Sequence, residues 1–165
     1  AYPDNMDEND PYQPPTSRTR SQGNAAPLYT LHGVVVATIL GSLAAAVVIV
    51  CLNYLSLGSS SLAKKTALAG AAIYLLVIGL TSLLPESLVI GSIMIVVQAV
   101  LGYLLANQLQ GGAIRYHVAQ GGRVHSNFRA AGIGLLTGFV IMFAVVFVAT
   151  LFQVGGAGGL QLPAQ

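Results

Sequence analysis

The sequence has few charged residues. Asp, Glu, Lys and Arg make up 7% of its 165 residues, against roughly 25% in an ordinary soluble domain. It has no tryptophan and a single cysteine, Cys51. One cysteine excludes an intramolecular disulfide, and its place in an apolar run predicts a small buried side chain rather than a redox centre. The scarcity of charged residues excludes an ordinary soluble domain.

Four apolar runs are long enough to cross a hydrocarbon core, which needs about 20 helical residues. They cover about 29–57, 66–84, 88–109 and 130–152, and none contains Asp, Glu, Lys or Arg in its interior. We therefore predict an all-α polytopic membrane protein with a four-transmembrane-helix bundle over 29–153. Residues 1–28 are predicted to be a disordered, proline-rich polar tail, and residues 154–165 a flexible glycine-rich tail.

The tail contains the stretch DPYQPPTS, residues 10–17. This stretch resembles the "NPYxPP" tails that open many small, uncharacterised multi-spanning proteins of bacterial inner membranes. The resemblance covers about eight residues and implies a bacterial inner membrane, without implying an activity. A polyproline II ligand for a partner is the alternative to a plain spacer.

The seven basic residues all lie outside the apolar runs. Two are in the tail, two in the first connection and three in the third connection: Arg18, Arg20, Lys64, Lys65, Arg115, Arg123 and Arg129. If all four runs cross the membrane, the first and third connections share a side that collects five of them. The positive-inside rule then places these connections in the cytoplasm and both termini outside, although Arg18 and Arg20 weigh against that orientation.

Small residues recur at four-residue intervals in the first and fourth runs. Such ridges let helix backbones approach closely in lipid, where the hydrophobic effect does not drive helices together. We predict that they face the bundle interior or a neighbouring subunit. The predicted packing residues are Gly33, Ala37, Gly41 and Ala45 in the first run, with Gly134 and Gly138 in the fourth.

Outside the N-terminal tail, the sequence has few of the ionisable side chains that catalysis or proton transport would need. The only carboxylate outside the tail is Glu86, so a paired-carboxylate mechanism has no second member. Charges inside membrane helices are the usual marks of proton-coupled transport, and the apolar runs have none. We predict no catalytic, cofactor-binding or metal site, and no enzymatic activity.

Two polar side chains mark the third run, Gln98 near its middle and Asn107 near its end. Hydrocarbon offers Gln98 no hydrogen-bond partner, so the side chain must find one inside the protein. We predict an interhelical bond to Thr38, Ser42 or Thr137. A pore or substrate contact is the alternative.

The third connection, from 110 to 132, contains two Gln-Gly-Gly copies ten residues apart. We predict a short amphipathic interfacial helix on an anionic leaflet, separated from its neighbours by Gly111, Gly112, Gly121 and Gly122. Ser126 or Asn127 is expected to cap the fourth helix. The residues predicted to contact lipid or a partner are Arg115, His117, Arg123, His125 and Arg129.

This connection does not suit a metal ion or a nucleic acid. Two histidines eight apart lack the further ligands that zinc requires. Basic residues beside a membrane already have anionic headgroups as partners, which argues against nucleic-acid binding.

These observations favour a non-enzymatic membrane protein that acts through helix contacts. It would be an accessory or scaffold subunit of a membrane complex, or a homo-oligomer. A small channel or transporter formed by oligomerisation, with Gln98 and Asn107 along the path, is one alternative. A membrane-resident immunity or regulatory protein with a partner outside is another.

Overall fold

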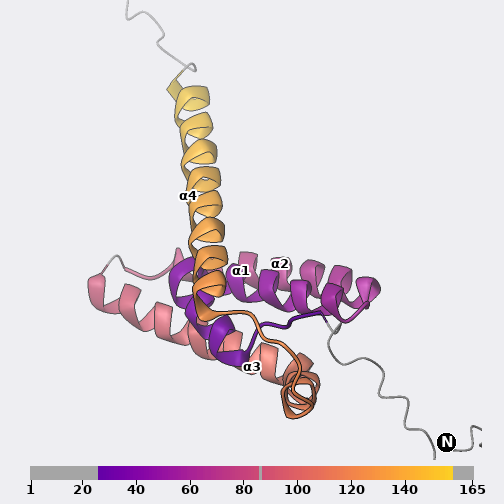
Figure 1. Cartoon of the computed structure of the whole chain (residues 1–165). Coiled ribbons are helices and arrows are strands. Elements are labelled where there is room, and N and C mark those ends of the chain that lie inside the picture. The colour runs from indigo at the N-terminus through magenta and orange to yellow at the C-terminus, as the bar shows by residue number, and fades with distance from the viewer. Residues whose placement is uncertain (1–25, 86, 158–165) are drawn as a thin grey trace, which may run out of the picture.

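The computed structural model describes residues 26–85 and 87–157, and this part of the chain is helical. Its helices are α1 (Leu31–Ser56), α2 (Ser60–Thr81), α3 (Leu88–Ala119) and α4 (Asn127–Ala157) (Figure 1). All four are long and apolar enough to cross a membrane, which agrees with the all-α prediction. The tail prediction for 1–25 and the predictions for 158–165 lie outside the described residues.

The first helix is broken in its middle. Gly41 and Ser42 have non-helical backbone angles, and Ser42 has φ 69° and ψ −179°. We call residues 31–40 the first arm of α1 and residues 43–56 its second arm. The sequence predicts one continuous crossing over 29–57, and the structure corrects this to two short arms.

The two ends of α1 meet each other. The side chain of Asn53 accepts a hydrogen bond from the Tyr29 backbone N–H at 2.8 Å and donates one to the Tyr29 carbonyl at 3.0 Å. In a straight helix, 24 residues would separate these positions by about 36 Å. The contact therefore requires α1 to fold back on itself at Gly41 and Ser42.

The fold-back makes α1 the centre of the protein. Fully buried side chains from both arms form its core: Val34, Ala37, Ala45, Ala46, Ile49 and Val50. Helices α2, α3 and α4 each pack on α1, and within the described residues they make no extensive contact with one another. The predicted bundle is therefore a central hairpin with three helices around it.

Helix α3 continues through the first Gln-Gly-Gly copy, although Gly111 and Gly112 were predicted to end it. Gln110, Gly111 and Ile114 are buried there, and this burial outweighs the cost of about 1 kcal/mol for a glycine inside a helix. The second copy does end the helix, because Gly121 has φ +73° and Gly122 N–H bonds to the His117 carbonyl. The predicted interfacial helix is thus the last part of α3.

The segment before α1 pairs with the connection between α3 and α4. Leu28 N–H donates to the Arg123 carbonyl at 3.2 Å, and His125 N–H donates to the Leu28 carbonyl at 2.9 Å. This single parallel bridge joins Leu28 to Val124. The start of α1 and the third connection therefore lie at the same end of the molecule, and not at opposite ends as four simple crossings require.

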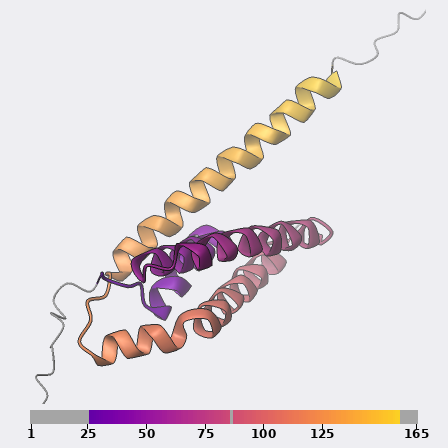
Figure 2. The same ribbon diagram turned by 90° about the vertical axis from the view of Figure 1, so that its right-hand side faces the viewer.

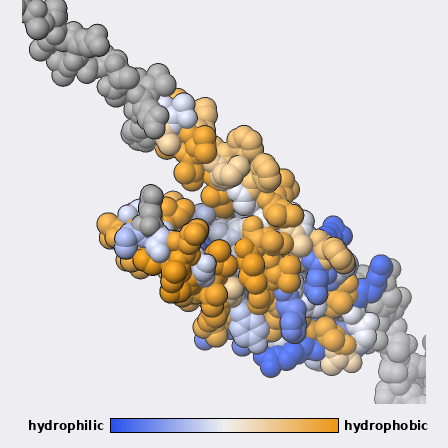
Figure 3. Space-filling view, turned by 90° about the vertical axis from the view of Figure 1, so that its left-hand side faces the viewer, coloured by the Kyte–Doolittle hydropathy of each residue, from blue (hydrophilic) through white to orange (hydrophobic). Residues whose placement is uncertain are grey.

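We call this end the basic end and define it as residues 26–30, 57–65 and 115–129. Figure 3 shows strongly hydrophilic side chains gathered at the end away from the projecting half of α4. Helix α4 crosses α1 with its first half, and its second half extends beyond the other helices (Figures 1 and 2). It remains helical through residues 154–157, which were predicted to belong to a flexible tail.

Candidate functional site

The crossing of α1 and α4 is built from small residues. The Cα of Gly134 lies against the backbone of Ala37, and a methyl group added to Gly134 would sit 2.6 Å from the Ala37 carbonyl oxygen. A methyl group added to Gly41 would collide with the Gly134 carbonyl, and one added to Gly138 would sit 3.1 Å from the Leu40 carbonyl oxygen. Only glycine permits this approach.

The structure therefore brings most of the sequence-predicted packing residues together within one chain. Gly33 joins them through Ala130, whose Cβ is 3.3 Å from where a Gly33 Cβ would stand. Ala45 is fully buried in the second arm of α1. Because this ridge is used inside the chain, it is not a free surface for a neighbouring subunit.

Helices α2 and α3 each supply a polar group to the break in α1. The Leu43 N–H lost its helical partner at the break and donates to the Gln98 Oε1 of α3 at 3.0 Å. The Ser42 hydroxyl lies 3.3 Å from the Tyr74 hydroxyl of α2. Gln98 thus bonds the backbone next to Ser42, and none of the three hydroxyl groups that the sequence suggested as its partner.

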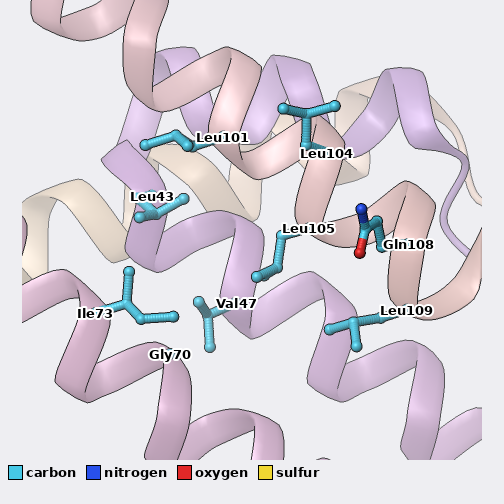
Figure 4. A pocket seen from close by; sticks show the side chains of 9 residues that line it. All are labelled: Leu43, Val47, Gly70, Ile73, Leu101, Leu104, Leu105, Gln108 and Leu109. Carbon is cyan, nitrogen blue, oxygen red and sulfur yellow. The ribbon is translucent and has the colours of Figure 1, made fainter.

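Gln98 also ends a groove between α2 and α3. This groove has a volume of about 310 Å³ and runs from the α2–α3 connection to Gln98, lined by Thr81, Leu84, Pro85, Ser87, Ile90, Gly91, Met94 and Gln98. We call it the outer groove. On the other side of the break, a second groove of about 310 Å³ lies between α2, α3 and the second arm of α1 and is lined almost entirely by apolar side chains (Figure 4).

Side-chain amides hold the far end of α1. In addition to the Asn53 bonds, Gln110 donates from Nε2 to the Val50 carbonyl at 2.8 Å, and the Tyr54 hydroxyl donates to the Leu109 carbonyl at 3.3 Å. The Gln110 Oε1 is buried without a hydrogen-bond partner in the described part of the chain. Sequence reasoning missed Asn53 and Gln110, whose only signal was an amide close to the end of an apolar run.

Asn107 belongs to this end and not to the outer groove. Its Oδ1 accepts a hydrogen bond from the Arg115 guanidinium at 2.9 Å, and Arg115 also bonds the Gly111 carbonyl at 3.1 Å. The structure does not bring Asn107 and Gln98 to one path.

Two histidines, His117 at the end of α3 and His125 in the connection between α3 and α4, make contacts that hold this connection. The His117 Nε2 lies 2.9 Å from the Arg123 carbonyl oxygen, and the His125 ring packs on Tyr29 with 4.3 Å between the ring centres. Burial lowers the pKa of His125, and the positive charges of Arg129 and Arg123 lower it further. The Ser126 hydroxyl caps α4 by accepting from Arg129 N–H at 3.4 Å.

The cations of the basic end have no carboxylate near them in the part of the chain that the structure describes, since 26–85 and 87–157 contain no Asp or Glu. No group of three or more metal-binding side chains occurs in those ranges. The exposed cations are Lys64, Lys65, Arg115, Arg123 and Arg129.

Comparison with protein-family models, with curated proteins and with solved structures finds no match to this chain. The fold and the site themselves define an all-helical protein whose apolar helices suit a membrane and surround a folded-back central helix.

Proposed function

We propose that the chain is a multi-pass membrane protein that acts through helix contacts and not as an enzyme. The observation that carries this proposal is the second half of α4, which leaves the other helices and exposes large apolar side chains. An exposed apolar surface of this extent marks a membrane or protein contact.

The fold-back suggests how the chain lies in the membrane. With α1 folded back, only α2, α3 and α4 cross, and α1 enters and leaves on the side of the basic end. The described chain also begins at this end, so the tail with Arg18 and Arg20 enters there. All seven Lys and Arg residues then belong to one side, which the positive-inside rule makes cytoplasmic.

This placement agrees with the positive-inside rule for Arg18 and Arg20, which a four-crossing topology does not. Four crossings leave two arginines on the wrong side, whereas three crossings and a hairpin leave none. The C-terminal end of α4 then lies outside with the α2–α3 connection, while the N-terminal end lies inside. The tail resemblance favours a bacterial inner membrane. The cations of the basic end would contact anionic headgroups.

The placement is tested by attaching an impermeant thiol reagent to single cysteines in a Cys51→Ala background. Ala26→Cys and Gly121→Cys should be labelled from the same side, and Ser82→Cys from the other. Labelling of Ala26→Cys from the side of Ser82→Cys would contradict the fold-back.

The surface of α4 suits a second copy of this chain as its partner. Phe139, Phe143 and Phe147 form a ridge at four-residue spacing, and between 57% and 65% of each side chain is exposed. The ridge continues the helix whose first half already packs on α1 in the same chain. Aromatic side chains are enriched in protein interfaces, and no comparable aromatic ridge occurs on the described parts of α2 or α3.

Oxidative cross-linking tests this contact. In the Cys51→Ala background, Phe143→Cys should form a disulfide-linked dimer in native membranes, because a two-fold contact centred on the ridge places the two copies of its middle residue beside the symmetry axis. Leu76→Cys on α2, which is similarly exposed, is the matched control and should stay monomeric. A monomer with both variants would overturn self-association, and gentle extraction with a different chain in stoichiometric amount would indicate an accessory subunit instead.

A further inference from the structure

The fold-back leaves the outer half of the protein without a central helix. The ten residues of the first arm extend about 15 Å, which is half of a hydrocarbon core of roughly 30 Å. Helices α2 and α3 continue past the break and do not pack extensively on each other. The outer groove occupies the space between them.

The lining of the outer groove changes along its length. Hydroxyl groups of Thr81 and Ser87 lie near its mouth, Ile90 and Met94 follow, and the amide of Gln98 forms its inner end. Ten residues of α3 separate Leu88 from Gln98, so the amide lies about 15 Å from the start of the helix. None of its described lining residues carries a charge.

Only the oxygen of the Gln98 side-chain amide has a hydrogen-bond partner among the described residues. Its oxygen accepts the Leu43 N–H, whereas its nitrogen carries two N–H donors that make no hydrogen bond within the described residues. An unpaired polar group in hydrocarbon costs several kcal/mol. These donors require an oxygen atom that lipid tails do not supply.

We propose that the outer groove is a water-filled vestibule that admits small uncharged solutes, whose oxygen atoms accept hydrogen bonds from the Gln98 amide. The groove volume of about 310 Å³ far exceeds the 10–15 Å³ or so that one water molecule needs. Because the Gln98 amide offers hydrogen-bond donors and no formal charge, the solutes expected there are uncharged hydrogen-bond acceptors such as alcohols and amides.

The vestibule ends at the break in α1. Beyond it, Leu43, Leu101, Leu104 and Leu105 line the second groove (Figure 4). Apart from Gln108 its lining is apolar, so it offers water few hydrogen-bond partners. The vestibule is therefore a binding recess open to one side of the membrane and not a continuous channel. This inference rests on the proposed placement in the membrane, goes beyond the proposed contact function and does not depend on self-association.

Thiol accessibility tests the presence of water. In the Cys51→Ala background, we compare Met94→Cys in the groove with Val97→Cys, which lies nearby on α3 but does not line the groove. Only a thiolate reacts with a charged methanethiosulfonate, and hydrocarbon suppresses its ionisation, so Met94→Cys should react at least about tenfold faster. Reaction should come from the side of the α2–α3 connection. Equal, slow reaction of both variants would overturn the proposal.

Adding Gln98→Leu tests the role of the amide. The double variant with Met94→Cys should react about as slowly as Val97→Cys, while Ile90→Cys near the mouth should stay reactive and report a retained fold. Unchanged reaction at Met94→Cys would overturn the role of Gln98.

Glycerol and urea serve as solute probes. Either probe should slow the reaction of Met94→Cys and leave that of Ser82→Cys, outside the groove, unchanged. Failure of both to protect Met94→Cys would overturn solute binding.

Discussion

Helices α1 and α4 are both apolar, both rich in small residues and in contact with each other, yet they have opposite structures. More than half of the most apolar window of α1 is buried, against 6% for α4. Helix α1 breaks and turns back, while α4 remains helical from Asn127 to Ala157. Apolar composition alone therefore does not determine whether a helix runs straight or folds back.

The difference lies in what surrounds each helix. The break in α1 exposes backbone groups that cost free energy in an apolar environment, and other helices compensate for them. Gln98 of α3 binds the Leu43 N–H at the break. Asn53, in the second arm of α1, binds both backbone groups of Tyr29 and holds the two ends of α1 together. In the described part of the second half of α4, through Leu151, no side chain of another helix hydrogen-bonds to the backbone, which keeps its helical bonds and one bond from the Thr150 hydroxyl to the Val146 carbonyl.

The largest expected effect concerns the crossing of the two helices. Gly134→Ala should destabilise the protein by about 3 kcal/mol or more, because the added methyl group meets backbone that cannot rotate away. The matched control is Gly132→Ala on the same helix, where a methyl group meets nothing within 4 Å. It should be neutral or stabilising by up to about 1 kcal/mol. Thermal unfolding in detergent measures both, and equal midpoints would contradict the close crossing.

Asn53→Leu should open the fold-back. The change leaves the N–H and carbonyl of Tyr29 buried without partners, at a cost of about 2–4 kcal/mol. Gln108→Leu replaces an exposed amide on α3 and should change stability by less than about 0.5 kcal/mol. Unfolding midpoints provide the comparison. If the two variants were equally stable, the contact between Asn53 and Tyr29 would not hold α1 together.

Two substitutions of Ser42 test the break in α1, because one should stabilise the protein and the other should destabilise it. Its φ of 69° with an extended ψ suits glycine, so Ser42→Gly should relieve strain and stabilise the protein by about 1 kcal/mol net of the lost Tyr74 contact. Ser42→Ala loses that contact and keeps the strain, so it should destabilise by a similar amount. A lower midpoint for Ser42→Gly than for Ser42→Ala would indicate a continuous helix at this position.

The smallest effect concerns the link between the start of α1 and the connection before α4. The folded protein holds the pKa of His125 below its ordinary value, so below about pH 6.5 the unfolded chain binds more protons than the folded chain. Stability should be constant above that pH and decrease as the pH falls through the folded pKa. His125→Asn should flatten this dependence in a series of melts, and an unchanged slope would exclude His125 as its source.

The sequence predicted the helices well because run length and lack of charge are local properties. Four-residue spacing also placed Gly33, Ala37 and Gly41 on one predicted packing face, and the structure places these residues against α4. It did not predict the break, because Gly41 fits a packing ridge and a helix break equally well. The partners that favour the break are Gln98 and Gly134, which are distant in sequence.

The two Gln-Gly-Gly copies are a second case in which contacts distant in sequence determine the local structure. They are identical in sequence, yet α3 continues through one and ends at the other. Gln110 packs against the second arm of α1 and bonds Val50, whereas the residues after Gln120 are drawn into the pairing of Val124 with Leu28. Tertiary contacts, and not the local sequence, distinguish the copies.

The bridge between Leu28 and Val124 also constrains the order in which the protein is made. The two residues are 96 positions apart, and a ribosome adds residues one at a time from the N-terminus. Leu28 must therefore wait until the whole of α3 has been synthesised before its pairing partner exists. The break in α1 lacks Gln98 until α2 and part of α3 have been made, and it lacks Gly134 until after Val124. The final shape of α1 is therefore acquired late in biogenesis.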